Sequence, residues 1–157
     1  MKQIELTQGQ YAIVDDEYFD EVNQYNWYSN NGYAVRSVEI SKGKRTKQQM
    51  HRIITNCPDG FEVDHINHDK LDNRKSNLRV CSTSENQQNQ KIRTKAKTSS
   101  YKGVNFDKHA GKWRARIMLN NKREYLGYFT NEIDAAIAYN VAAIELFGEF
   151  ALLNEIG

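Results

Sequence analysis

The clearest alternation of apolar and polar positions in the chain runs through residues 111–129. A period of two is typical of a β-strand with one buried face. The positions predicted to be buried are Trp113, Ala115, Ile117 and Leu119. The positions between them, on the predicted outward face, are Arg114, Arg116 and Met118.

The same segment contains a hairpin signal. Two asparagines at 120–121 fit a two-residue turn, because Asn tolerates the positive φ that such turns require. This turn places Met118 opposite Arg123 and Arg116 opposite Tyr125. The second strand therefore adds an Arg and a Tyr to the cationic face.

Residues 131–148 carry a helical period instead. The apolar positions at helical spacing are Ile133, Ala136, Ile137, Ile144 and Phe147. Gly148 supplies a stop. We expect one amphipathic helix that packs behind a small sheet.

The first half of the chain mixes both periods. Residues 11–15 and 32–40 have strand character, and residues 16–29 predict a helix whose acidic first turn suits its dipole. Residues 60–80 predict two short strands joined by a turn-rich loop. This half is therefore expected to be α+β.

A helix is predicted to follow over residues 82–91. Ser82 and Glu85 form a capping-box signature, which places Asn86 on the first or second turn. A hairpin followed by a helix can bring Asp64 and Asn86 within reach of one ion. One carboxylate and one amide oxygen suit magnesium better than a soft metal.

A connector separates the two patterned halves. Residues 91–103 mix cations with Thr and Ser, as a solvated linker does. A chain of 157 residues can form one large domain or two small ones, and this connector favours two. The predicted boundaries are 1–92 for the first domain, 93–100 for the linker and 101–157 for the second.

The distribution of charge indicates a polyanionic partner. The chain carries 22 Lys and Arg against 20 Asp and Glu, a net charge of +2, which predicts no partner by itself. Between Lys91 and Tyr125, however, a run of Lys and Arg is opposed only by Asp107 and Glu124. Cations spread for solubility alone would not cluster in this way.

Composition disfavours several classes of protein. Cys57 and Cys81 are the only cysteines, so neither a disulfide framework nor a Cys-X-X-Cys zinc site is expected. Nothing in the sequence resembles a signal peptide, and no long apolar run occurs, so neither a signal peptide nor a membrane span is expected. We expect a soluble cytoplasmic protein with no membrane partner.

The cationic sheet face has several interpretations. Charged surface strands are often simply solvated. The density of Arg favours a sheet laid into a DNA groove, because guanidinium groups suit phosphate oxygens and guanine edges. A third alternative is a non-catalytic module that binds RNA or protein.

The segments YKGVNFDKHAGKWRARI, EYLGYF and DAAIAYNVAAIELFGEFALLN resemble the plant ethylene-response-factor (APETALA/ERF-type) DNA-binding domain over nearly all of residues 99–154. The resemblance implies a three-stranded antiparallel sheet that reads the major groove of double-stranded DNA, with one helix packed behind it. The positions matching the family's contacts are Lys102, Asn105, Arg114, Arg116, Arg123 and Tyr125. Plant members usually carry Arg and Trp in place of Asn105 and Tyr125, so base preference is not transferred.

The segment VDHINHDKLDNRKSNLRV and its flanks resemble a second family. Asp64, His65, Asn77 and Asn86 match the motif of HNH endonucleases of the phage and intron-encoded homing type, in which the last histidine is replaced by asparagine. The resemblance extends upstream through MHRIITNCPDGFE and into the N-terminal leader. It implies an N-terminal ββα-metal nuclease domain with its core near 61–91.

This second resemblance implies a metal-dependent DNA endonuclease. By this resemblance, His65 would be the general base that takes a proton from the attacking water, and Asn77 would fix the orientation of its imidazole. Asp64 and Asn86 would hold one Mg²⁺ or Mn²⁺ ion against the scissile phosphate. We expect nicking by a monomer or weak dimer, in the host cytoplasm if the protein is phage-encoded.

Other polar residues are weighed against structural roles. His68 in the loop and Arg93 in the linker are secondary candidates for contacts with metal or DNA. His51 lies among apolar residues, which predicts a packed structural histidine. The alternative function is a non-catalytic DNA-binding regulator, which the complete set of four motif residues argues against.

Overall fold

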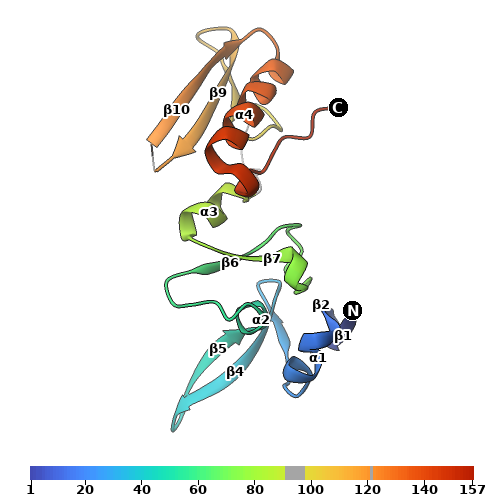
Figure 1. Cartoon of the computed structure of the whole chain (residues 1–157). Coiled ribbons are helices and arrows are strands. Elements are labelled where there is room, and N and C mark those ends of the chain that lie inside the picture. Colours follow the sequence, from blue (N-terminus) through green and yellow to red (C-terminus); the bar gives the residue numbers. More distant parts are fainter. Residues whose placement is uncertain (91–97, 121) are drawn as a thin grey trace. The chain divides into compact units, whose positions relative to one another are not determined.

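The computed structural model describes residues 1–90, 98–120 and 122–157. Contacts divide the chain into two compact units, Met1–Thr83 and Ser84–Gly157. Both combine helices with small antiparallel sheets, as expected for a mixed α and β chain (Figure 1). The linker predicted at 93–100 falls largely outside the described residues, so the predicted domain boundaries stay a prediction.

The first unit opens with a hairpin and a helix. β1 (Lys2–Glu5) pairs antiparallel with β2 (Tyr11–Val14), and α1 (Asp16–Asn23) follows. β1 was not predicted, because its four residues are mostly polar and only Ile4 is buried.

α1 is shorter than the helix predicted over 16–29. The Trp27 indole N–H donates to the Val22 carbonyl oxygen at 2.7 Å, and the Trp27 ring is buried. The chain then continues as a strand rather than as a further helical turn. The three-stranded sheet that results has the order β3 (Tyr28–Asn30), β4 (Tyr33–Ser41), β5 (Lys44–Gln49).

A short helix leads into the segment that carries the motif. α2 (Met50–Ile54) precedes the antiparallel hairpin of β6 (Glu62–His65) and β7 (Leu78–Cys81), which the sequence predicts correctly. A single 3-10 turn, η1 (Lys75–Asn77), comes immediately before β7, and α3 (Thr83–Gln88) comes after it.

One core joins the N-terminal hairpin of the first unit to the β6–β7 hairpin. Its buried members are Ile4, Leu6, Ala12, Val14, Val22, Trp27, Ala34, Met50, Ile54, Val63 and Leu78. Val63 on β6 therefore packs with residues near the start of the chain. This packing fixes the strand that carries Asp64 and His65.

The second unit is a three-stranded antiparallel sheet with one long helix packed on it. The strands have the order β10-β9-β8, and their bounds are β8 (Val104–Asp107), β9 (Lys112–Leu119) and β10 (Lys122–Phe129). α4 (Glu132–Phe147) begins at an N-cap, Asn131, whose side chain accepts a hydrogen bond from the Asp134 backbone N–H at 2.7 Å. Figure 1 shows this helix alongside the sheet, and it contacts β9 and β10.

The predicted register of the β9–β10 hairpin is confirmed. Met118 pairs with Arg123, and Arg116 pairs with Tyr125. Asn120 adopts the positive φ that the turn requires, 49°. Residue 121 lies outside the described residues.

α4 turns a different face to the sheet from the one predicted. The expected inward residues Ile133, Ile137 and Ile144 are exposed, whereas Ala136 is buried as predicted. The other buried positions of α4 are Ala135, Tyr139 and Ala143. Small residues let the helix approach the strands closely, and this close approach takes precedence over burying the larger side chains.

Candidate active site

Two motif residues lie next to each other on β6. Asp64 pairs with Arg79 across the hairpin, and His65 pairs with Leu78. The Asp64 and His65 residues are only 6% and 5% exposed. A buried carboxylate requires a charge partner, and a buried imidazole favours its neutral form.

Arg79 supplies the charge partner of Asp64. Its Nε and Nη2 donate to the same Asp64 oxygen, Oδ2, at 2.9 and 2.7 Å. The two side chains are largely buried as well, so solvent screens the pair little. The orientation of the Asp64 carboxylate is therefore set from the opposite strand.

Two aromatic side chains surround the imidazole of His65. Its ring centroid lies 5.1 Å from that of His51 on α2 and 5.7 Å from that of Tyr33 on β4. Tyr33 and His51 also contact each other, at 5.2 Å. These separations are typical of packed ring pairs, so each of the three rings restricts the other two.

Burial sets the protonation of this ring cluster. Burial lowers the pKa of the His65 imidazole, although the Asn73 side chain and nearby carboxylates oppose the shift. Burial lowers the pKa of His51 to about 3, with the adjacent His65 as a second cause. Burial raises the pKa of the Tyr33 hydroxyl. His51 is consequently neutral at physiological pH.

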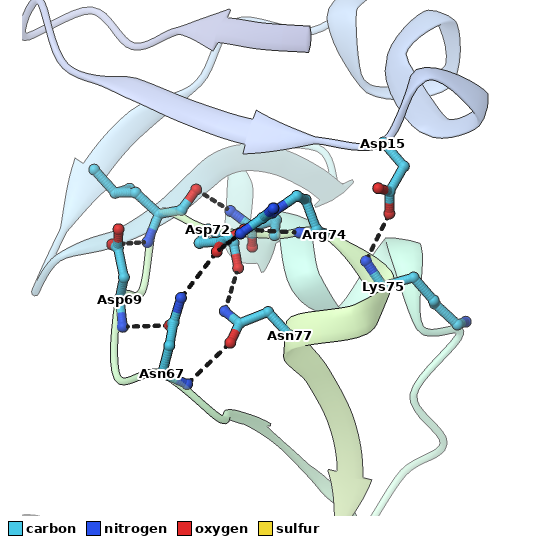
Figure 2. Close-up of polar contacts among 9 residues, drawn as sticks. Asp15, Asn67, Asp69, Asp72, Arg74, Lys75 and Asn77 are labelled. Atoms are coloured by element: carbon cyan, nitrogen blue, oxygen red, sulfur yellow. Dashed lines mark hydrogen bonds and ion pairs between the residues drawn. The ribbon is translucent and has the colours of Figure 1, made fainter. Parts of the chain in front are cut away.

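The loop between β6 and β7 is closed by Asn77, as Figure 2 shows. The Asn77 Oδ1 accepts a hydrogen bond from the Asn67 backbone N–H at 2.9 Å, and its Nδ2 donates to the Asp72 carbonyl oxygen at 2.8 Å. The Asn77 carbonyl oxygen also accepts from the Ile66 backbone N–H at 2.9 Å. Asn77 thus ties together both ends of the segment that follows His65.

Asp72 forms the centre of the same loop. Arg74 donates from Nε to Asp72 Oδ1 at 2.7 Å and from Nη2 to Oδ2 at 2.6 Å, and Asn67 Nδ2 donates to Oδ2 at 2.9 Å (Figure 2). These bonds, those from Arg74 above all, lower the pKa of the Asp72 carboxyl. Asp72 and Arg74 therefore have a structural role in the loop.

The N-terminal hairpin holds the outer side of the loop. Ile13 on β2 donates its backbone N–H to the Leu71 carbonyl oxygen and accepts from the Asn73 backbone N–H, both at 2.8 Å. The Asp15 carboxylate accepts from the Lys75 backbone N–H at 2.7 Å (Figure 2). The leader thus positions the loop that the motif residues share.

The predicted nuclease residues fall into two groups. Asp64, His65 and Asn77 lie together at the base of the β6–β7 loop. Asn86 lies on α3, within the second compact unit, so its pairing with Asp64 around one ion stays a prediction. His68 occupies a turn with φ of 65°, where its backbone N–H donates to the His65 carbonyl oxygen. Arg93 lies outside the described residues.

Five of the six predicted DNA contacts share one face of the sheet in the second unit. Cross-strand partners point to the same side, and so do residues two positions apart. Asn105 pairs with Arg114, and Arg116 pairs with Tyr125. Arg123 lies two positions before Tyr125, and Tyr125 is 65% exposed.

The sixth predicted contact, Lys102, lies just before β8. Its backbone N–H and carbonyl bond to the side chain of Asn154, and its Nζ donates to the Gln88 carbonyl oxygen. On the sheet, Arg114 donates to Asp107 at 3.2 Å. These bonds orient two of the cations.

Sequence reasoning missed Tyr33 as part of the site and gave His51 a purely structural role. His51 is packed as predicted, but the ring it packs against is His65. Sequence reasoning also did not pair Arg79 with Asp64, although the two residues lie opposite each other in the β6–β7 hairpin. Nothing in the local pattern marks Tyr33, because its contact with His65 depends on how distant strands fold together.

Comparison with known proteins places the chain in a family. HNH endonucleases match residues 55–88. An uncharacterized HNH endonuclease of Acanthamoeba polyphaga mimivirus is 34% identical over 155 residues, which cover 94% of this chain and 76% of the viral protein. The chain belongs to the HNH endonuclease family, and its activity is that of a nuclease.

The C-terminal part is similar to a different group of proteins. An AP2-like ethylene-responsive transcription factor of Arabidopsis thaliana is 47% identical over 58 residues, which are 36% of this chain and 17% of the plant protein. Another ethylene-responsive transcription factor of the same plant is 45% identical over 58 residues, 14% of its length. The second unit thus resembles a small part of each plant protein.

No helix in the described ranges has the length and apolar character needed to cross a membrane.

Proposed function

We propose that this chain is a metal-dependent DNA endonuclease that nicks duplex DNA, with His65 as the general base. The placement of His65 supports this proposal most strongly. The imidazole is buried beside Asp64, packed against two rings and followed by a loop that Asn77 closes. Because burial favours its neutral form, it is suited to accept a proton from water at physiological pH.

In this proposal β6, β7 and α3 form a ββα-metal core, and Asp64 and Asn86 would hold one Mg²⁺ or Mn²⁺ ion. A carboxylate and an amide oxygen are donors that suit such a hard cation. Bound there, the ion would supply positive charge against the scissile phosphate. Among the described residues no group of three or more His, Cys, Asp or Glu could hold a metal. The proposed ligands are one Asp and one Asn, so they do not form such a group.

The protein residues divide the remaining work. His65 would take the proton of the attacking water. Asn77 would position His65 indirectly, by holding the Asn67 and Asp72 backbones of the loop. Arg79 would keep the Asp64 carboxylate in one orientation.

The second unit would bind the DNA through its sheet. Hydrolysis of a phosphodiester is blind to sequence, so a separate DNA-binding surface would provide residence on the duplex. Arg114 and Arg116, with Arg123 and Tyr125 beside them, offer cations and an aromatic ring on one face. The similarity to plant transcription factors supports this assignment.

A plasmid-cleavage assay tests the proposal. The full chain with Mg²⁺ or Mn²⁺ should convert supercoiled plasmid to the nicked form, and His65→Ala should lose this activity at least a hundredfold, the order of a general base contribution. His109→Ala, which removes an exposed histidine of the second unit, is the matched control and should cleave normally.

Two outcomes would overturn the assignment. Wild-type protein that binds duplex DNA but leaves the plasmid intact with both metals would be a DNA-binding regulator. Unchanged nicking by a folded His65→Ala variant would remove His65 from the role of general base.

A further inference from the structure

Lys70 is held in a defined position by the turn between β3 and β4. Its Nζ donates a hydrogen bond to the Asn31 carbonyl oxygen at 3.1 Å. The same ammonium lies 4.3 Å from the centre of the Tyr33 ring. The two contacts come from residues nearly forty positions earlier in the sequence, so the loop after His65 and this turn are packed together.

The turn is built to accept the lysine. Asn31 and Gly32 both have positive φ, 52° and 82°, as a tight two-residue hairpin turn requires. A Cβ added at Gly32 would come within 3.3 Å of the Lys70 Cδ. The missing side chain therefore leaves room for the lysine stem.

The contacts orient the ammonium without neutralising its charge. Among the described residues, the partners of Lys70 are a backbone carbonyl and an aromatic ring, and it forms no ion pair with a carboxylate. The neighbouring Asp69 is occupied by the loop, since its Oδ1 accepts the Leu71 backbone N–H at 3.0 Å. Ordering a long side chain at the surface costs rotamer entropy. A cation that is ordered but not neutralised is suited to bind an anion.

Tyr33 connects this cation to the nuclease site. Its ring contacts the Lys70 ammonium and also the His65 imidazole, whose centroid lies 5.7 Å away at an interplanar angle of 51°. The Lys70 ammonium and the His65 imidazole therefore both depend on the position of the Tyr33 side chain.

Successive phosphates of one DNA strand are separated by only about 3.4 Å along the helix axis.

We propose that Lys70 binds a DNA phosphate next to the one that is cleaved, and that Tyr33 positions both the Lys70 ammonium and the His65 imidazole. This inference rests on the proposed nuclease function. Lys70 contributes to substrate binding as a point charge and takes no part in proton transfer. Tyr33 acts through its two neighbours.

Substitutions of Lys70 with a matched control test the binding role. Lys70→Met removes the charge and keeps the length, and Lys70→Arg keeps the charge. Lys2→Met is the control, because the Lys2 Nζ also lies over an aromatic ring, 4.4 Å from that of Phe19, elsewhere in the same unit. The full chain carrying His65→Ala would be titrated with a fluorescent duplex at several salt concentrations.

Lys70→Met should weaken duplex binding about tenfold, and the slope of log K against log salt should become shallower by about 0.9, the value for one phosphate contact. Lys70→Arg should retain most of the affinity, and Lys2→Met should bind like the parent. In the chain that retains wild-type His65 and can therefore nick DNA, Lys70→Met should raise KM and change kcat less than twofold. Equal affinity and slope for Lys70→Met and Lys2→Met would overturn the inference.

Substitution of Tyr33 tests the positioning role. Tyr33→Phe keeps the ring and both contacts, so nicking should stay near the wild-type rate. Tyr33→Leu should raise KM and lower kcat together, because it releases Lys70 and His65 at once. A Tyr33→Leu protein that melts normally and nicks normally would refute the role.

The DNA-binding titration separates this inference from the nuclease proposal. If wild-type protein fails to nick DNA with either metal, the nuclease function fails, while the Lys70 salt slope still reports on the phosphate contact. If it nicks DNA but Lys70→Met binds like Lys2→Met, only the Lys70 assignment fails.

Discussion

Arg79 reaches across the β6–β7 hairpin and donates two hydrogen bonds to a single oxygen of Asp64, at 2.9 and 2.7 Å. The pair is buried, so the guanidinium offsets a carboxylate charge that solvent cannot reach. The Asp64 carboxylate is therefore held in one orientation in advance of any ligand. The arrangement combines a structural ion pair with a residue proposed to bind metal.

Breaking this pair should destabilise the first unit. Arg79→Met is expected to lower its free energy of unfolding by about 3–5 kcal/mol, since it leaves the Asp64 carboxylate buried without its guanidinium. The double variant with Asp64→Asn should recover a large part of this loss. Urea unfolding followed through amide signals of residues 1–83 measures both, and equal stability of single variant and wild type would contradict the prediction.

Asn77→Ala should loosen the loop at one identifiable place. The Asn67 amide loses its acceptor, and the Asp72 carbonyl loses its donor, at a cost of about 1–3 kcal/mol. Hydrogen exchange at the Asn67 amide should accelerate strongly. The Ile66 amide is an internal control, because it bonds to the backbone of Asn77; faster exchange at Ile66 to the same degree would indicate general unfolding of the hairpin instead.

His51 should make stability depend on pH. Its folded pKa of about 3 lies below the ordinary value for histidine, so below about pH 6.5 the unfolded chain binds a proton that the folded chain does not. The contribution of His51 to the free energy of unfolding is complete above about pH 6.5. It declines by about 1.4 kcal/mol per pH unit on acidification towards pH 3.

The variant His51→Phe isolates this contribution. It should flatten the pH dependence of the free energy of unfolding between about pH 4 and pH 6, leaving the part that comes from other groups such as His65. Urea denaturation at a series of pH values gives the slopes. Identical slopes in a folded variant and in wild type would show that His51 titrates normally.

Gly103 should be far less tolerant of substitution than Gly111. Both have positive φ, 79° and 63°, but a Cβ at Gly103 would lie 2.1 Å from the Tyr139 Cδ2 and 2.6 Å from the Arg116 carbonyl oxygen. Gly111→Ala meets open space and should cost only about 1 kcal/mol for its backbone conformation. Thermal melting should show a clearly larger loss for Gly103→Ala, and equal losses would mean that α4 can shift to make room.

The outward sheet face should govern the salt dependence of DNA binding. Replacing Arg114, Arg116 and Arg123 together by Met removes three candidate phosphate contacts, so the slope of log K against log salt should fall by up to about 2.7. Fluorescence anisotropy with a random-sequence duplex measures it. Lys108, in the exposed loop before β9, provides a control substitution; unchanged affinity in the triple variant would exclude this face as the DNA-binding surface.

Local periodicity predicted the elements that depend on it. The alternation over 111–129 gave the correct strands and the correct pairing of Arg116 with Tyr125, because a one-residue slip would expose the buried face. It did not predict β5, whose residues KRTKQQ are polar and mostly exposed, nor α2, which is too short to show a helical period. β5 and α2 form because they pair with or pack against neighbouring elements such as β4.

The candidate site was only partly accessible to sequence reasoning, for a related reason. Asp64, His65 and Asn77 could be named because they lie in one short stretch that resembles the HNH motif. Tyr33 and His51 come from β4 and α2, and their contacts with His65 arise from tertiary packing alone. The inward face of α4 was misjudged because side-chain size was weighed and the close approach of the helix to the sheet was not.

The hydrogen bonds from Ile13 and Asp15 to the loop after β6 limit which part of the chain could be grafted into another protein. The stretch that matches the family, residues 55–88, does not carry its own scaffold. Grafted alone into another protein, it would bring the reactive side chains without the strand that shapes their loop. A transferable version of this loop therefore has to include β2 and the following Asp15, which hold it.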